Sequence, residues 1–265
     1  MSKPPLSRRE PLFLGFGLAG GLLVIFVVLP LLSTMIATRP VAIIEALKDP
    51  AVLSSLGLTL YAAAVATLLA LVTGVPLAYL LARHDFIGKR LVESLIDLPV
   101  VIPHTAAGIA LLVVFGRRGL LGQIVTPLGI EFTGSVAGIV VAMLFVSLPF
   151  LVNGAREAFA LVDPELEAVA LTMGANRWQA FRYVTLPLAG RGILSGALMM
   201  WARGMSEFGA VVILAYNPKI VPVVVYERFI GFGLEYARPV AVILILAALI
   251  VFILLRALAA PRDDR

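Results

Sequence analysis

The stretch EAVALTMGANRWQAFRYVTLP, residues 167–187, combines charged side chains, two short helical patterns and a central glycine within a strongly apolar chain. Neither half of the stretch is apolar enough to enter lipid. Helices of this length are only marginally stable in water unless they pack against another structure. The stretch therefore predicts a water-exposed loop that is stabilised by packing, and the rest of the chain decides where that loop lies.

The composition places the chain among polytopic membrane proteins. Hydrophobic residues make up 61% of its 265 residues and charged residues only 14%, too little charge to coat a soluble domain of this size. The chain has no cysteine, which excludes disulfide frameworks, thiolate metal sites and cysteine nucleophiles. The net charge of +5 follows one face of the membrane, so we expect no nucleic-acid partner.

Six apolar segments approach the length of about 20 residues that a helix needs to cross the hydrocarbon core. They are 12–37, 52–82, 98–116, 132–155, 188–216 and 239–255, the fifth being interrupted by Arg191, Arg203 and Glu207. The first apolar run is too long for a signal-peptide core, so we expect an uncleaved span over 11–37. The sequence predicts an all-α protein with six transmembrane helices, and six crossings place both termini on one side.

The distribution of basic residues predicts the orientation. With a cytoplasmic N-terminus, thirteen lysines and arginines lie inside and seven outside, and Arg203 lies within the fifth span. The positive-inside rule favours this orientation. We therefore expect cytoplasmic tails at 1–10 and 256–265 and a large cytoplasmic loop at 156–187 that contains the opening stretch. No internal repeat is visible, which argues against a transporter built from inverted repeats in one chain.

Residues 163–174 carry the signals of a short, capped helix. Asp163 has the chemistry of an N-cap, Pro164 suits the first helical position, and Glu165 adds an acid to the first turn. Gly174 supplies a left-handed stop. One apolar stripe is expected along this helix, made of Leu166, Val169, Ala170 and Met173.

A second short helix is expected after the glycine. Asn176 and Gln179 have the spacing of a capping box, and Pro187 is expected to end the helix. Trp178 and Phe181 share a face with Val184 or Thr185. Two interpretations of this aromatic pair stay open at this point: the rings pack against the ends of the protein's own helices, or they project and dock on another protein.

The motif Glu167-Ala168-Val169-Ala170, Gly174-Ala175, Phe181 and Leu186-Pro187 resembles the EAA loop of type I ABC importer permeases. That family usually has glutamate six residues before the glycine, where this chain has Ala168, so the resemblance does not assign the partner of Glu167. It implies that 175–184 is a coupling helix seated in a groove of a separate ATPase subunit. The implied docking residues are Glu167, Gly174, Ala175, Asn176, Arg177, Trp178, Phe181, Leu186 and Pro187.

The chain has no nucleotide site of its own. The segment 86–90, FIGKR, offers a Gly-Lys pair but lacks the other positions of a phosphate-binding loop. We therefore expect a transport subunit that is not an enzyme and carries no cofactor, with ATP and Mg²⁺ bound by the partner ATPase.

Three further stretches resemble permeases for molybdate and tungstate, and the similarity extends over about 11–256. They are 97–105 (DLPVVIPHT) with 108–110, 201–210 (WARGMSEFGA) and 226–229 (YERF). Sulfate permeases are similar around 207–210, so sulfate stays an alternative. The resemblance implies a transporter core over 54–255, a homodimer, two ATPase subunits, an extracytoplasmic oxyanion-binding protein and a place in the cell membrane.

Ionisable residues at membrane depth usually face a cavity or a partner. Arg203 and Glu207 are four residues apart on one helical face and are expected to pair, either as a pore-side pair or as a structural pair that joins two helices. Two prolines are expected to bend the third span just before His104, which is either a simple hydrogen-bonding residue or a ligand. The candidates for a pathway or gate are Pro99, Pro103, His104, Thr105, Arg203, Ser206 and Glu207.

Two other classes of function are weighed against import by an ABC system. An ion-coupled secondary transporter would need neither an EAA loop nor an ATPase. An intramembrane enzyme would need a catalytic pair, and neither a serine-protease constellation nor a His-Glu-x-x-His zinc motif is present in the sequence.

Overall fold

The computed structural model describes residues 11–259, and every regular element in that range is helical. The long helices are α1 (Pro11–Ile36), α3 (Pro50–Arg83), α7 (Val136–Ala160), α10 (Leu186–Met205) and α13 (Leu234–Ala259). The shorter ones are α2 (Pro40–Lys48), α4 (Lys89–Val101), α5 (His104–Phe115), α6 (Gly122–Val125), α8 (Pro164–Thr172), α9 (Arg177–Ala180), α11 (Gly209–Leu214) and α12 (Val221–Phe232). The predicted all-α class is confirmed. The predicted tails lie outside the described residues, apart from 256–259, which complete α13.

Among the described residues 11–259, five continuous helices are long and apolar enough to cross a membrane: 13–36, 50–83, 136–160, 177–205 and 234–253. A sixth crossing exists only if α4 and α5 count together, and these two helices meet at an angle of 117°. The bend that the two prolines predict within the span 98–116, just before His104, is confirmed, and it lies between α4 and α5. Ile102 is extended, as a residue before proline prefers, and Pro103 has no N–H with which to continue α4.

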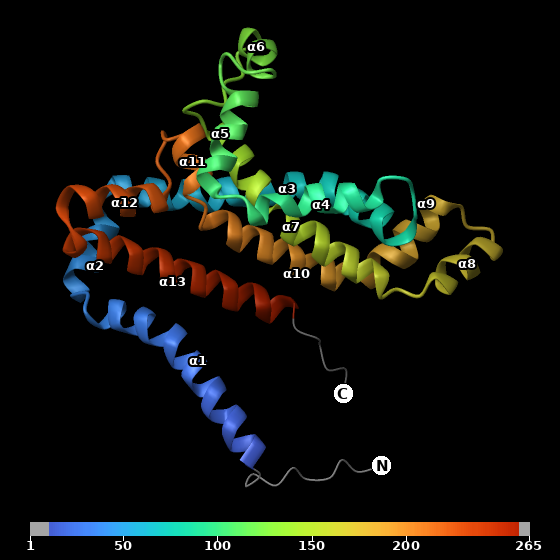
Figure 1. Ribbon diagram of the computed structural model, residues 1–265, viewed down its shortest axis with the longest axis horizontal. Helices are drawn as coiled ribbons and strands as arrows, with labels where there is room; N and C mark the ends of the chain where they lie inside the picture. Colours follow the sequence, from blue (N-terminus) through green and yellow to red (C-terminus); the bar gives the residue numbers. More distant parts are fainter. Residues whose placement is uncertain (1–10, 260–265) are drawn as a thin grey trace.

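The fifth predicted span, 188–216, is also broken. Helix α10 ends at Met205, and a short non-helical segment, 206–208, separates it from α11. Figure 1 shows α11 turning away from the direction of α10 and lying beside α5. The two broken segments of the chain therefore meet.

Two prolines that were expected to bound helices lie inside them. Pro187 does not end the loop helix, because a π-helical turn over 181–185 carries the chain from α9 directly into α10. There Pro187 occupies the first turn of α10, where a missing N–H is tolerated. Pro239 likewise lies within α13, which begins at Leu234, so the sixth span is longer than the predicted 239–255.

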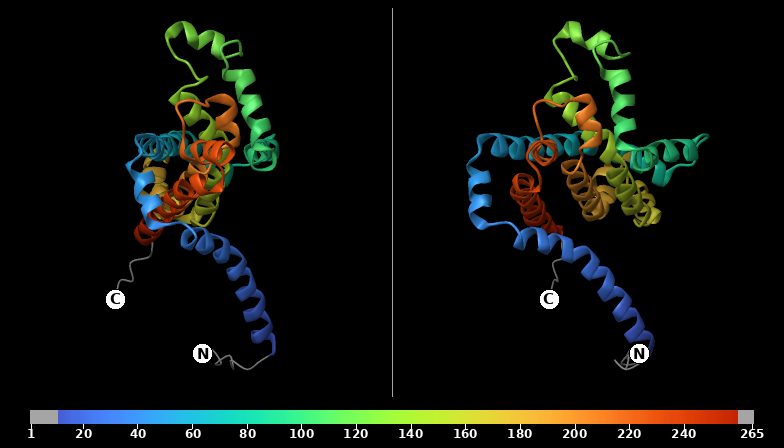
Figure 2. Two further views of the ribbon diagram at one scale, coloured as in Figure 1. Left: turned by 90° about the vertical axis from the view of Figure 1, so that its left-hand side faces the viewer. Right: turned by 60° about the vertical axis from the view of Figure 1, so that its left-hand side comes forward.

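The core is formed by α3, α7 and α10, which lie side by side in both views of the bundle (Figures 1 and 2). Small residues allow the close contacts. A Cβ added to Gly154 on α7 would lie 3.0 Å from the Cα of Gly196 on α10, and one added to Gly192 would lie 2.4 Å from the Cβ of Ala158. Helices in membranes usually associate through close contacts between small residues, because lipid tails are as apolar as the side chains and no hydrophobic driving force brings the helices together.

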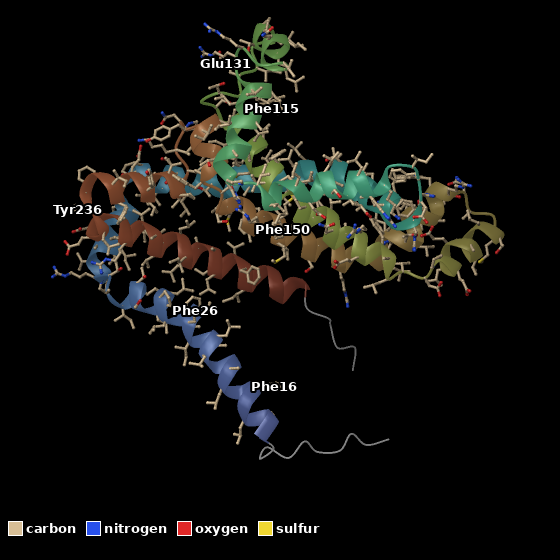
Figure 3. All side chains as sticks on the ribbon, viewed as in Figure 1. Phe16, Phe26, Phe115, Glu131, Phe150 and Tyr236 are labelled. Atoms are coloured by element: carbon tan, nitrogen blue, oxygen red, sulfur yellow. The ribbon has the colours of Figure 1, made fainter. Side chains whose placement is uncertain are left out.

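Helix α1 stands apart from this core. Its mean hydropathy is 2.5, and Phe16 and Phe26 are 71% and 75% exposed. Figure 3 shows both rings extending from α1 into open space. A helix that is apolar all round and long enough to cross the hydrocarbon core is suited to contact with lipid or with another apolar helix.

The bundle has two distinct ends. One end carries α2, α12 and the beginnings of α3 and α13, whereas the opposite end carries α8, α9 and the end of α3 (Figure 1). Helix α10 runs from the α8–α9 end toward α11, so the loop 163–187 and the α10–α11 break lie far apart along the bundle.

Candidate functional site

The loop 163–187 leaves the bundle as two helices joined at a glycine. The Oδ1 of Asp163 accepts the N–H of Glu165 at 2.9 Å, and Pro164 is the first residue of α8. Gly174 adopts a φ of +93°, a left-handed conformation that side chains with a Cβ adopt only with strain. The predicted start and stop of this helix are both confirmed.

The second loop helix begins at the predicted capping box. Asn176 accepts the N–H of Gln179 at 2.9 Å, and Gln179 accepts the N–H of Asn176 at 2.8 Å. The ring centroids of Trp178 and Phe181 are 5.6 Å apart, so the two rings share a face. Only the tryptophan projects, since Phe181 turns inward against Tyr79, with ring centroids 4.8 Å apart. Of the two interpretations of the aromatic pair, packing against the protein's own helices holds for Phe181, whereas Trp178 is 68% exposed.

Glu167 joins α8 to the rest of the bundle. Its carboxylate accepts hydrogen bonds from Arg83 Nε at 3.0 Å, Tyr79 OH at 3.0 Å and Thr185 Oγ1 at 2.8 Å. Arg83 also donates to the carbonyl of Val162 at 2.8 Å. These partners come from α3 and from the π-helical turn, so one carboxylate positions both halves of the loop, and sequence analysis did not identify any of the three.

The loop exposes several large apolar side chains. Of the predicted stripe, Leu166 is 46%, Val169 55% and Met173 83% exposed, and Ala170 is half-buried. Trp178 on α9 is 68% exposed. We call the four exposed side chains the loop surface. Among the other predicted docking residues, Leu186 packs against the core, Ala175 is half-buried, and Asn176, Arg177 and Pro187 are exposed.

A second polar site links the two helix breaks. Arg203 Nη2 lies 3.0 Å from Glu207 Oε2, which confirms the predicted pair. His104, the first residue of α5, joins them: its Nδ1 lies 2.6 Å from Glu207 Oε2 and its Nε2 lies 2.9 Å from Arg203 Nη2. Glu207 is 1% exposed, and its Oε1 also accepts the N–H of Ala210 at 2.8 Å. A buried carboxylate with three partners thus satisfies its own hydrogen bonds and caps the start of α11.

The site depends on close backbone approach between α5 and α11. A Cβ on Gly209 would lie 2.7 Å from the Cβ of His104, and one on Gly108 would lie 2.9 Å from the Cα of Ala210. Of the other predicted pathway residues, Pro99 is buried in α4, whereas Pro103, Thr105 and Ser206 are exposed.

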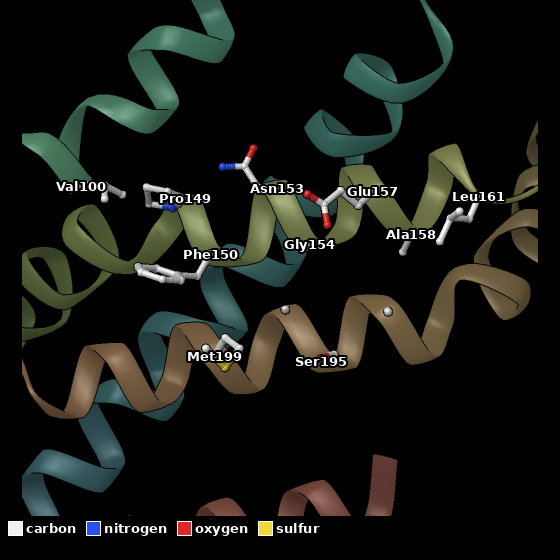
Figure 4. Close-up of a pocket in the computed structure, with 12 residues that line it drawn as sticks. Val100, Pro149, Phe150, Asn153, Gly154, Glu157, Ala158, Leu161, Ser195 and Met199 are labelled. Atoms are coloured by element: carbon white, nitrogen blue, oxygen red, sulfur yellow. The ribbon is translucent and has the colours of Figure 1, made fainter. Parts of the chain in front are cut away.

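A cavity of about 470 Å³ lies along the seam between α7 and α10 (Figure 4). Phe150, Asn153 and Glu157 line it from α7, and Ser195 and Met199 line it from α10. The lining therefore mixes polar and apolar side chains within a segment that is long and apolar enough to cross a membrane.

Two polar contacts that sequence analysis missed fasten α4 beside this cavity. Asn153 donates to Asp97 Oδ1 at 2.6 Å, and Arg156 donates to Glu93 Oε1 at 2.9 Å. Within residues 11–259, no group of three or more metal-ligating His, Asp or Glu side chains comes together.

The family model described as the inner membrane component of binding-protein-dependent transport systems matches residues 74–261, more than half of the chain. The chain belongs to this family. Its members are transport subunits and not enzymes, and the apolar helices described above make this permease a multi-pass membrane protein.

The permease is similar over nearly its whole length to proteins named molybdate/tungstate transport system permease protein WtpB. The one from Thermococcus kodakarensis is 42% identical over 258 residues, covering 97% of this chain and 99% of the relative. The one from Pyrococcus furiosus is 46% identical over 255 residues, covering 95% and 96%. The sulfate transport system permease protein CysT of Salmonella typhimurium is 33% identical over 210 residues, covering 78% and 76%.

Solved structures share the fold of the permease. A bacterial ABC transporter involved in the import of the acidic polysaccharide alginate matches with a TM-score of 0.74 at 16% identity, covering 95% of this chain and 96% of that one. The MetNI methionine ABC transporter matches with a TM-score of 0.64 at 19% identity, covering 78% and 94%. The predicted type I ABC importer permease fold is confirmed.

Proposed function

We propose that this permease is the membrane subunit of an ATP-driven importer of molybdate and tungstate. The observation that carries the proposal is the identity of 42% and 46%, over 95% or more of this chain, to two permeases named for these anions. The sulfate permease named above is less similar and covers less of the chain, which favours molybdate and tungstate over sulfate as the imported anion.

The loop surface is the proposed docking site for the ATPase. Leu166, Val169, Met173 and Trp178 are large apolar side chains exposed on a loop that is too charged to lie in lipid. Covering them with a groove of another protein removes apolar area from water, which stabilises the complex. Glu167 and Phe181 hold the loop on the permease, and Trp178 is the proposed central anchor. ATP and Mg²⁺ bind to the partner ATPase.

The remaining partners follow from the same proposal. The loop surface lies in the cytoplasm, and both termini lie on that side, as the basic residues of the sequence favour. Two copies of the permease form the pathway between them, and two ATPase subunits bind on the cytoplasmic side. An extracytoplasmic oxyanion-binding protein docks at the opposite end, over 39–54, 117–131 and 217–238. The pathway alternates between outward and inward openings as the ATPase pair closes and hydrolyses ATP.

Reconstitution tests the transported anion. The permease, its ATPase and its binding protein are placed in proteoliposomes, and ATP-dependent uptake of molybdate, tungstate and sulfate is measured. We expect molybdate and tungstate to be imported and to compete with each other, and sulfate to be imported poorly. Equal import of sulfate would contradict the anion assignment, and uptake by the permease alone under an ion gradient would contradict the ABC mechanism.

Co-purification tests the docking site. Gly174→Pro removes the left-handed stop, and Trp178→Asp places a charge in the apolar anchor, so we expect both variants to insert in the membrane but to lose the ATPase. Ile87→Asp is the matched control, because Ile87 is a fully exposed apolar residue outside the loop surface. Retention of the ATPase by both loop variants would exclude this docking site.

A further inference from the structure

We propose that Arg203 is a transient binding residue for a tetrahedral oxyanion at the head of the cavity between α7 and α10, held in position by Glu207 and His104. The inference rests on the proposed import of an oxyanion and assigns a site for that anion within the permease. It begins from the donors that the cluster leaves available.

Arg203 uses only part of its hydrogen-bonding capacity in the cluster. A guanidinium has five N–H donors arranged in a planar fork. Nη2 faces Glu207 and His104, and Nη1 reaches the Ser206 hydroxyl at 3.2 Å. The Arg203 side chain stays 23% exposed while Glu207 is 1% exposed. Glu207 therefore fixes Nη2 of the guanidinium, and the N–H groups that Glu207, His104 and Ser206 do not engage are left for a ligand with oxygen acceptors.

Arg203 lies on α10 about one helical turn beyond Met199, the last α10 residue that lines the cavity. Met199 and Ser195 line the cavity from α10, and Arg203 follows at the same interval of four residues. Residues four apart lie on one helical face, so Arg203 continues the lined face of α10 toward α11. A partly exposed arginine in a segment at membrane depth faces a water-filled or protein-lined space rather than lipid. We assign this space to the continuation of the cavity along the same face of α10.

The charges of the cluster favour brief, weak binding of a passing anion over tight binding. Glu207 cancels the charge of Arg203, so an arriving anion gains directed hydrogen bonds without meeting a net positive site. A pathway must hold its ion firmly enough to admit it and weakly enough to release it. The exposed hydroxyl of Thr105, which follows His104 in the sequence, adds a neutral donor of the kind that a tetrahedral oxyanion accepts. Glu157, farther along the cavity, carries the same sign as the anion and favours its release from that end.

The test uses the complete transporter in proteoliposomes and compares uptake of molybdate with ATP hydrolysis stimulated by the loaded binding protein. For Arg203→Gln we expect uptake to fall at least tenfold while stimulated hydrolysis stays within about twofold, so that uptake per ATP is lost. For Arg203→Lys, which keeps the charge but not the fork, we expect an intermediate loss. Arg191→Gln is the matched control, since Arg191 is an exposed arginine on the same helix away from the cluster.

A double variant separates a binding role from a structural ion pair. If Arg203 and Glu207 only hold helices together, Arg203→Gln with Glu207→Gln removes both charges of the pair and should restore uptake lost in either single variant. If Arg203 binds the anion, the double variant stays as defective as Arg203→Gln. Restored uptake in the double variant, or normal uptake in Arg203→Gln, would overturn the inference. Failure of the unaltered transporter to import either anion would instead refute the proposed function.

Discussion

Replacing Glu167 with alanine should release the loop 163–187 from the bundle. The change removes the acceptor for Arg83, Tyr79 and Thr185 together. Thr185 is fully buried and the Arg83 side chain is 10% exposed, so water does not readily replace the lost acceptor. Leaving a buried donor without a partner costs about 1–3 kcal/mol for each group.

The expected effect is an increase in the equilibrium constant for local opening of α8. Arg83 keeps its hydrogen bond to the Val162 carbonyl, so it contributes less to the destabilisation than a donor left without any partner. We expect the three lost hydrogen bonds to destabilise the closed loop by about 3 kcal/mol in total. A loss of this size raises the opening equilibrium by about 100-fold, since about 1.4 kcal/mol corresponds to a factor of ten. Glu167→Gln keeps one acceptor oxygen and removes only the charge, and should therefore give a smaller increase.

Hydrogen exchange of the α8 amides measures this opening directly in the detergent-solubilised permease. We expect exchange in 164–172 to be about 100-fold faster in Glu167→Ala, with weaker retention of the ATPase. Glu165→Ala is the control, because Glu165 is an exposed acid on the same helix. If exchange in Glu167→Ala stays within about threefold of the unaltered protein, Glu167 does not hold the loop.

Three further perturbations probe other parts of the structure. Burial raises the pKa of Glu227, but hydrogen bonds from Lys219 and a neighbouring tyrosine outweigh it and hold the pKa below its usual value. These hydrogen bonds stabilise 215–232 at pH values above the unfolded-state pKa of Glu227, and this stabilisation should be lost as pH falls through the folded-state pKa. Limited proteolysis measures the loss. Glu227→Gln should abolish the pH dependence. Gly174 and Gly88 have nearly equal φ values, +93° and +91°, and open surroundings, so Gly174→Ala and Gly88→Ala should strain the backbone and lower the stability by similar amounts. Only Gly174→Ala should also weaken retention of the ATPase. Gly209→Ala should lower the melting temperature through a loss of about 1–3 kcal/mol, because its Cβ would meet the first residue of α5, whereas alanine at an α1 glycine should be neutral.

Features that depend on neighbouring residues could be predicted from the sequence. The Asp163 cap, the left-handed Gly174 and the capping box at Asn176 each involve residues within three positions of one another, and the structure contains all of them. The pairing of Arg203 with Glu207 is of the same kind, because four residues span one helical turn. Such signals need no knowledge of the fold.

Contacts between distant segments could not be predicted in this way. Glu167 meets Arg83 across 84 positions, and His104 meets Glu207 across 103. No local pattern specifies which helices become neighbours. The fate of a proline is equally dependent on context: Pro103 ends a helix, whereas Pro187 continues one because the π-helical turn before it absorbs the change in hydrogen bonding.

The two breaks in the predicted spans, one before His104 and one after Met205, meet in the structure. A break frees backbone groups at membrane depth, where each unsatisfied group costs several kcal/mol, so it persists only where protein or water satisfies it. At the second break a buried carboxylate does so: Glu207 accepts the N–H of Ala210 at the start of α11, and its other oxygen binds the imidazole of His104 at the start of α5. Gly209 lets the two helix starts approach closely enough for that single side chain to reach both. A purely structural link between the breaks could be made by apolar side chains without burying a charge, whereas the charged link that is present leaves the Arg203 side chain 23% exposed, about one helical turn beyond the last α10 residue that lines the α7–α10 cavity.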